Sequence, residues 1–147
     1  MAGEEDRHNL FSYLEGRFGI SKGLFDDCLL FKKNKTWWLL KDSPLVKPTS
    51  QLKVRRIGLK AFQSIGIFIK PTTRMIQLFG HKAARAVLDI NERDIQKLAA
   101  GGLIPAVMDI DNGYVILSFK SRILGLGLLI DGMVRSQIPQ KDIKSFI

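Results

Sequence analysis

The sequence predicts an α+β protein in which an N-terminal α+β domain, residues 1–68, packs on a C-terminal mixed β-barrel, residues 69–147. Apolar residues at helical spacing open the chain, which indicates a helix in the first domain. Near the other end, strand-like segments separated by tight turns follow one another at intervals of about 8 to 10 residues. No Ser/Gly-rich tract or charge block separates the halves, so we expect a packed interface between them.

The first domain begins with a predicted helix. Residues 4–18 carry apolar side chains at helical spacing, Asp6 or Asn9 can cap the segment, and Gly19 can end it. Residues 21–27 predict a short helical turn.

A β-hairpin is expected next. Residues 28–31 and 36–40 are strand-like, and a polar turn joins them. Because side chains alternate along a strand, Trp37 and Trp38 should lie on opposite faces, with one indole buried and the other partly exposed.

The middle of the chain combines loop, strand and helix signals. Residues 41–50 carry two prolines and predict a loop or broken turn. Residues 52–58 alternate apolar with basic side chains, which is typical of a half-buried strand with a cationic open face. Residues 58–64 predict a short helix, and the following strand should stop at Pro71, which has no N–H for a ladder.

The second domain is expected to combine one helix with a set of strands. Residues 86–90 predict a short strand, Asn91 can cap a helix over residues 92–100, and Gly101 and Gly102 end it. The remaining segments in chain order are a weak strand at 103–110, an Asp111–Gly113 hairpin turn, strands at 114–119, 123–130 and 133–139, and turns at Ser121–Arg122 and Asp131–Gly132. The barrel interior should hold Val115, Leu117, Leu124, Leu126 and Leu128.

The charge pattern is the strongest functional signal. The chain has 23 Lys and Arg against 14 Asp and Glu, a net charge of +9. From Ser43 to Leu88 there is no carboxylate, while the same stretch carries nine cations. A chance depletion on a solvated face is the simpler interpretation, and a surface that meets phosphates is the alternative.

The sequence contains few residues that could act in catalysis. His8 lies in an acidic terminal segment and His81 follows a glycine, and the sequence shows no recognisable constellation of nucleophile, base and orienting group. Asp27 and burial should raise the pKa of the Cys28 thiol, so Cys28 is expected to be a small core residue. Metal-ligand spacings and phosphate-binding glycine loops are absent from the sequence. We therefore expect no enzymatic activity, no metal and no cofactor.

The compartment is expected to be the cytoplasm. A single cysteine cannot form an internal disulfide, and the polar, acidic start is unlike a leader peptide. The longest apolar-plus-glycine run, Ile123 to Ile130, is far shorter than the roughly 20 residues of a membrane-spanning helix. No membrane contact is expected.

Cations interleaved with hydroxyl and amide donors form three candidate RNA-binding sets. The first is Lys53, Arg55 and Arg56; the second is Lys70, Thr72, Thr73, Arg74, Gln77, His81, Lys82 and Arg85; the third is Arg135, Gln137 and Lys141. A protein–protein adaptor with an incidental basic surface and a cofactor-dependent enzyme using His81 are the competing hypotheses.

Several short motifs resemble a known family. Residues 54–62 (VRRIGLKAF), 69–71 (IKP) and 76–81 (IQLFGH) are similar to the junction between a pre-PUA segment and a PUA domain in small archaeal and eukaryotic ribosome-biogenesis proteins. Residues 135–139 (RSQIP) resemble the PUA-like C-terminal domain of the Sun/nucleolar-protein family of RNA 5-methylcytosine methyltransferases. The chain lacks that family's catalytic Pro-Cys and Thr-Cys motifs, and Thr72 stands where a PUA domain typically has glycine.

The resemblance implies a PUA-like β-pseudobarrel that binds structured RNA, either rRNA or tRNA, without transferring a methyl group. It also implies a role in RNA modification or ribosome biogenesis. An RNA-modifying enzyme or a ribosome-assembly protein is the further expected partner.

Overall fold

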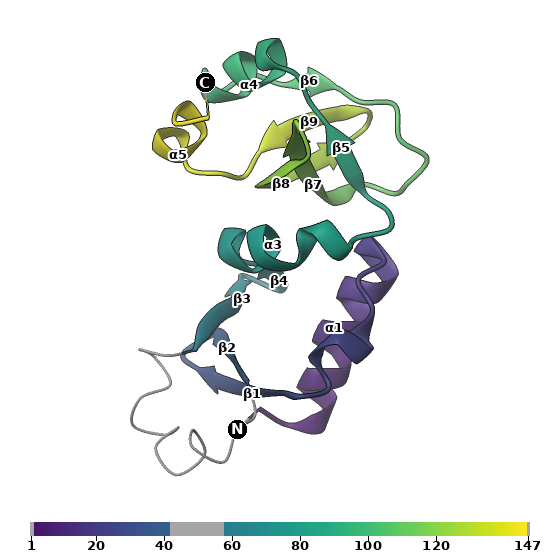
Figure 1. Cartoon of the computed structure of the whole chain (residues 1–147), viewed down its shortest axis with the longest axis vertical. Coiled ribbons are helices and arrows are strands. Elements are labelled where there is room, and N and C mark those ends of the chain that lie inside the picture. The colour runs from purple at the N-terminus through teal and green to yellow at the C-terminus, as the bar shows by residue number, and fades with distance from the viewer. Residues whose placement is uncertain (1, 42–57, 147) are drawn as a thin grey trace.

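The computed structural model describes residues 2–41 and 58–146. A four-stranded antiparallel sheet has the order β1-β2-β3-β4, and a five-stranded sheet has the order β5-β7-β8-β9-β6 (Figure 1). The chain is therefore α+β as predicted, and the second sheet curls into a half-barrel. The division into domains at residue 68 stays a prediction.

The first helix, α1, spans Glu4–Phe18 as expected and ends at Gly19, whose φ of 69° is left-handed. Its N-cap is Gly3, so the prediction of a cap at Asp6 or Asn9 was wrong. Acidic side chains occupy the first turn instead, where their negative charge interacts favourably with the positive end of the helix dipole. The side of α1 that faces the core carries Leu10, Phe11, Leu14 and Phe18, all buried.

A 3₁₀ turn, η1 (Lys22–Phe25), leads to the predicted hairpin of β1 (Cys28–Lys33) and β2 (Thr36–Lys41). Asn34 and Lys35 form the turn, both with positive φ. Trp37 is buried and its indole N–H donates to Asp6 Oδ2 at 3.3 Å, whereas Trp38 is half-buried. The expectation of opposite faces is confirmed.

Residues 58–64 do not form the predicted helix. The segment is strand β3, Leu59–Ile65, which pairs antiparallel with β2. Its register places Phe62 opposite Trp37 and Lys60 opposite Trp38, so Ala61 is an extra residue in a bulge. The bulge turns both Ala61 and Phe62 toward the core, so two adjacent residues are buried. This breaks the strand's alternation, and the apolar spacing therefore resembles that of a helix.

The strand after β3 is shorter than expected. Gly66, at a φ of 61°, makes a turn, and β4 covers only Phe68–Pro71. Pro71 ends the strand as predicted. Most of the predicted loop at 41–50 and most of the predicted strand at 52–58 lie outside the described residues. Lys53, Arg55 and Arg56 also lie outside them.

Helix α3, Thr73–Phe79, and the 3₁₀ turn η3, Gly80–Lys82, lie between the two sheets (Figure 1). The Thr72 hydroxyl caps α3 by accepting from the Met75 N–H at 3.1 Å and donates to the Lys60 carbonyl at 2.5 Å. Gly80 faces Ile123 of the second sheet so closely that an added Cβ would lie 3.0 Å from its Cγ2. This segment therefore packs against both sheets.

The second sheet is mixed, as predicted. The strand β5 runs parallel to β7, and every other pairing in this sheet is antiparallel. Its strands are β5 (Val87–Asp89), β6 (Ile104–Pro105), β7 (Gly113–Phe119), β8 (Arg122–Ile130) and β9 (Met133–Ser136). Two helices accompany them: α4 (Glu92–Ala99), which Asn91 caps through a box with Asp94, and α5 (Gln140–Lys144).

Two turn and strand predictions in this half were wrong. Asn112–Gly113 does not close a hairpin, because β6 pairs with β9 and not with β7. The Asn112 side chain instead bonds Asp131, accepting from its N–H at 2.9 Å and donating to its carboxylate at 3.2 Å. Only Ile104–Pro105 of the expected 103–110 strand is extended and paired, since Pro105 cannot donate to a longer ladder.

The middle of β7 and β8 is buried on both faces. Val115, Leu117, Leu124 and Leu126 are buried as predicted, whereas Leu128 is half-buried. Gly125 and Gly127 lie within the curved strand β8, where added Cβ atoms would come 2.7 Å from Ile138 and Val134 side chains respectively. One hydrophobic cluster joins side chains of both sheets and of α1.

Replacing the fully buried Leu117 by Ala should lower the free energy of unfolding by roughly 2–5 kcal/mol, because the cavity cannot fully collapse. Chemical denaturation measures the change. Val107→Ala, at a fully exposed position outside any strand, should change stability by no more than about 0.5 kcal/mol. Similar values for the two variants would contradict the described packing.

Fluorescence quenching of single-tryptophan variants should separate the two indoles. A Trp38→Phe variant reports on Trp37, which is 4% exposed and should resist a soluble quencher such as iodide. A Trp37→Phe variant reports on the half-buried Trp38, which should be quenched more strongly. Equal quenching would contradict the alternation along β2.

Candidate nucleic-acid interface

The outer side of α3 and η3 presents a group of predicted cations. Arg74, His81 and Lys82 are exposed, while Met75 and Ile76 of the same segment are buried. Helical periodicity places Arg74 on the side of α3 opposite the core. Arg85 is also exposed and donates to the Glu15 carbonyl of α1 at 3.3 Å. We call Arg74, His81, Lys82 and Arg85 the α3 cations.

Other predicted residues of this region have partners within the fold. Thr72 caps α3, and Gln77 donates to the Leu124 carbonyl of β8 at 3.1 Å. The Thr73 methyl group lies beside Gly125, and the Gln137 side chain donates to the neighbouring Ser136 carbonyl at 3.5 Å. Thr72 and Gln77 thereby help to hold α3 in place.

Lys70, another cation of the second predicted set, lies beside an aromatic ring. It lies on β4, is half-buried, and holds its ammonium 5.6 Å from the ring centroid of Tyr114 on β7. Burial lowers the pKa of Lys70 from its ordinary value. A cation over an aromatic face is an attractive arrangement, since the ring face carries partial negative charge.

Tyr114 begins a row of side chains across the second sheet. The strand register pairs Tyr114 with Leu128, and Leu128 with Arg135. Directly paired residues share a face of a sheet, so a ring, an aliphatic side chain and a cation lie side by side. Arg135 is exposed and the other two are half-buried. We call Tyr114, Leu128 and Arg135, with Lys70 above the ring, the sheet row.

An apolar pocket of about 400 Å³ opens at the Tyr114 end of the sheet row. Its lining comes from α1, β4, the start of β7 with the residue before it, and β8, and comprises Tyr13, Arg17, Phe68, Ile69, Asn112, Gly113, Tyr114 and Leu128. A second hollow of about 320 Å³ shares Leu128 and continues to Arg135. The two hollows are therefore neighbours across Leu128.

Arg17 builds the wall of the apolar pocket. Its guanidinium donates to the Tyr114 carbonyl at 2.7 Å and to the Asp111 carbonyl at 2.8 Å. Its remaining terminal nitrogen, Nη2, is buried without a partner among the described residues. Gly113, at a φ of 145°, leaves room for it, because an added Cβ would lie 3.2 Å from the guanidinium carbon. Burial raises the pKa of the neighbouring Tyr13 to about 12, so its hydroxyl stays protonated.

Sequence reasoning did not identify the aromatic and arginine members of this surface. It selected Lys70 and Arg135 for their charge and missed Arg17, Phe68 and Tyr114 as site residues. The available signal was weak: Tyr114 alternates with the core residues of its strand, which only indicates that it faces outward.

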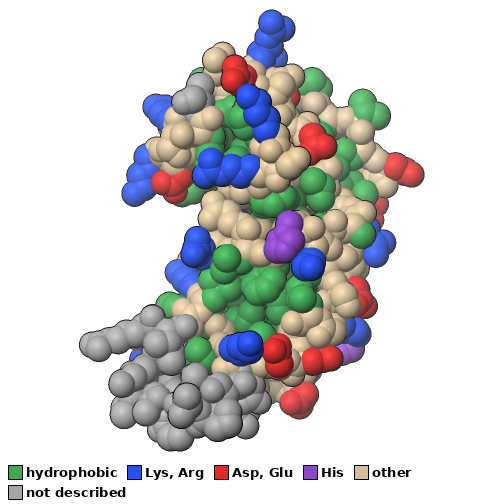
Figure 2. All heavy atoms as spheres, in the orientation of Figure 1, with side chains coloured by type: hydrophobic (Ala, Val, Ile, Leu, Met, Phe, Trp, Pro, Cys, Tyr) green, Lys and Arg blue, Asp and Glu red, His purple; other side chains and the backbone are tan. Residues whose placement is uncertain are grey.

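Lys141 is exposed in α5, which packs against α4. Figure 2 shows Lys and Arg side chains on both sides of the apolar surface in the middle of the molecule, with Asp and Glu below it, along one flank and toward the other end. The cations on this face are therefore dispersed around apolar surface.

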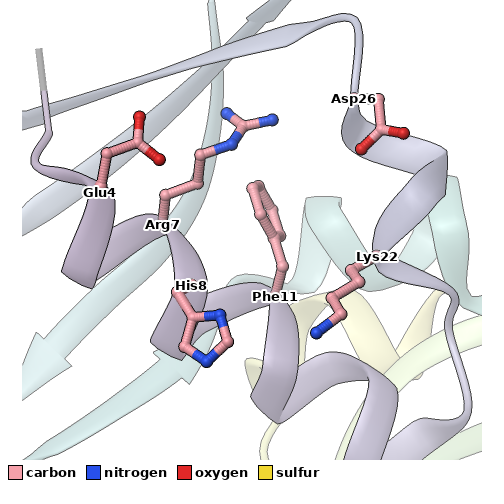
Figure 3. Close-up of a pocket in the computed structure, with 6 residues that line it drawn as sticks. All are labelled: Glu4, Arg7, His8, Phe11, Lys22 and Asp26. Carbon is pink, nitrogen blue, oxygen red and sulfur yellow. The ribbon is translucent and has the colours of Figure 1, made fainter.

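A different pocket lies between α1 and η1 (Figure 3). Glu4, Arg7 and His8 line it from α1, and Lys22 and Asp26 face them from the following segment. Arg7 is engaged, since it donates to the Cys28 and Phe25 carbonyls at 2.8 and 2.7 Å. The mixed charges make this pocket a poorer phosphate site than the α3 cations.

Cys28 is half-buried, and burial, with Asp27 beside it, raises the pKa of its thiol. The raised pKa agrees with the expectation, whereas Cys28 packs against the core and is not itself fully buried. Across the described ranges, 2–41 and 58–146, no three His, Cys, Asp or Glu side chains are grouped to hold a metal ion. No helix of the described residues is long and apolar enough to cross a membrane.

The chain is similar to an rRNA methyltransferase over most of its length. It is 26% identical to ribosomal RNA small subunit methyltransferase F of Psychromonas ingrahamii over 147 aligned residues, which cover 92% of this chain. The alignment covers only 28% of the length of that methyltransferase. No family model matches the sequence.

Replacing Arg17 by Ala should destabilise the protein by about 1.5–3 kcal/mol, because two charge-assisted hydrogen bonds between α1 and β7 are lost. Arg17→Lys should recover only part of this, since an ammonium lacks the planar fork that reaches both carbonyls. Thermal and chemical denaturation of both variants test the bridge. Wild-type stability in Arg17→Ala would contradict it.

Proposed function

We propose that this chain is a non-catalytic RNA-binding protein that acts in rRNA modification. The observation that carries the proposal is the similarity to an rRNA methyltransferase over 92% of the chain, combined with exposed cations next to aromatic surface. Such cations neutralise phosphates, while aromatic rings accept unpaired bases. An rRNA is the RNA partner we favour over tRNA.

The absence of catalysis is part of the same proposal. The single cysteine of this chain has a raised thiol pKa. A thiolate nucleophile needs the opposite shift. We infer that a separate RNA-modifying enzyme supplies the chemistry and that this chain supplies RNA affinity.

We further propose that the C-terminal half is a PUA-like domain. A mixed five-stranded half-barrel with a helix leading into it supports this assignment. Thr72 replaces the glycine typical of a PUA domain at this position, and here it caps α3. A threonine cap supplies the helix start that the segment needs.

The α3 cations are the phosphate-facing surface in this proposal. Arg74 lies in the first turn of α3, which carries no acidic residue. A cation there is disfavoured by the helix dipole, so helix stability does not account for it. Its exposed position supports a role in contacting phosphate.

A protein–protein adaptor is the second candidate function. Ile67 and Phe68 of the β3–β4 turn region are 92% and 67% exposed, and exposed apolar residues of this size mark many protein interfaces. Salt separates the two functions, because phosphate binding weakens as counterions are released and apolar docking does not.

Replacing Arg74 and Arg85 together by Ala should flatten the plot of log affinity for single-stranded RNA against log salt by about 1.4 units. This follows from about 0.7 per neutralised phosphate. Fluorescence anisotropy over a salt series measures the slope. Affinity should fall alike for different RNA sequences, because phosphate contacts do not read bases.

The matched control is Lys33→Ala with Lys41→Ala, which removes the same charge from the exposed ends of the β1–β2 hairpin. We expect this control to leave the slope nearly unchanged. Equal slopes for both double variants would indicate diffuse attraction, and an unaltered slope for the Arg74/Arg85 variant would refute the α3 cations as the site.

A further inference from the structure

We propose that the apolar pocket beside Tyr114 holds an unstacked nucleobase of single-stranded RNA, with the sheet row continuing the path of the strand. This inference rests on the proposed RNA-binding function and adds a base-binding subsite separate from the α3 cations.

Three aromatic side chains from three distant segments line the pocket. Tyr13 comes from α1, Phe68 from β4 and Tyr114 from β7. Phe68 is 67% exposed, which is unusual for a ring of this size in a strand. Every nucleobase has a π-face, so exposed rings accept bases whatever their sequence.

Two cations border the two hollows, at positions where they could contact RNA phosphates. Phe68 and Lys70 project from the same face of β4, because side chains alternate along a strand. The Lys70 ammonium is 5.6 Å from the Tyr114 ring centroid, so positive charge borders the pocket that Phe68 lines. Arg135, at the far end of the sheet row, borders the adjoining hollow.

One acidic side chain, Asp131, restricts the path of the RNA. Its carboxylate accepts from the side chain of Asn112, which lines the apolar pocket, and Asp131 itself lines the adjoining hollow. Phosphates are repelled there, so the backbone of the RNA should pass on the Lys70 side. Asn112 and Asp131 are then left to face the polar edge of the base.

The shape favours a strand of nucleotides over a compact small molecule. Two hollows of about 400 and 320 Å³ share Leu128 and extend across β7, β8 and β9. Each volume lies within the range of roughly 300–1,000 Å³ typical of ligand sites. Aromatic and aliphatic floor with cations at both ends matches the alternation of base and phosphate in single-stranded RNA.

The test compares Phe68→Leu with Ile67→Ala. Both positions are exposed and apolar and lie in the same hairpin, but only Phe68 carries a ring and lines the pocket. The probes are a fluorescent oligouridylate and a strand of equal length with abasic riboses, measured at one salt concentration. Phe68→Leu should weaken binding of the oligouridylate by roughly five- to 150-fold, the range for loss of one stacked base.

Binding of the abasic strand by Phe68→Leu should equal that of the wild type, and Ile67→Ala should match the wild type on both strands. The salt slope should stay unchanged in Phe68→Leu, because no charge is removed. Circular dichroism and thermal melting confirm that both variants fold, as expected for exposed positions.

Three results would overturn the inference alone: unchanged oligouridylate binding in Phe68→Leu, an equal loss on the abasic strand, or an equal loss in Ile67→Ala. The last would indicate an apolar protein-docking surface. Failure of the wild-type protein to bind either strand would overturn the proposed RNA-binding function itself, and the base subsite with it.

Discussion

Arg17 makes the contact through which the two halves of this protein meet on the side of the apolar pocket. It projects from the last turn of α1 and donates to carbonyls of Asp111 and Tyr114, more than 90 residues away in the chain. Because its guanidinium lies against the backbone at Gly113, the start of β7 is fixed against the helix. The position of the Tyr114 ring, and hence of the pocket, follows from this bridge.

Sequence patterns predicted most elements where each segment's own residues determine its structure. Asn91 begins α4 through a local capping box, and Asp131 and Gly132 turn the chain between β8 and β9 with their own positive φ angles. The failures have non-local causes. The bulge at Ala61 depends on the register with β2, and Asn112 bonds Asp131 of a different turn, so it does not close a hairpin itself.

In the candidate site, too, the residues recognised from the sequence are those that local sequence reveals, and the missed ones depend on non-local pairing. The cations were visible as residue types, and Arg74, His81, Lys82 and Arg85 are exposed. The sheet row was not visible, because the order β7-β8-β9 and its register bring Tyr114, Leu128 and Arg135 together. Nor could spacing show that Lys70, only four residues before Arg74, faces a different surface.

Thr72 sets the angle between these two surfaces. Phe68 and Lys70 precede it on β4, and Arg74 follows it on α3. Its hydroxyl accepts from the Met75 N–H and donates to the Lys60 carbonyl. These two hydrogen bonds fix the direction in which the chain leaves the strand and enters the helix. Thr72 thereby holds apart the two proposed RNA contacts, the phosphate contact at Arg74 and the base subsite beside Phe68. A glycine at this position would remove both bonds and loosen that geometry.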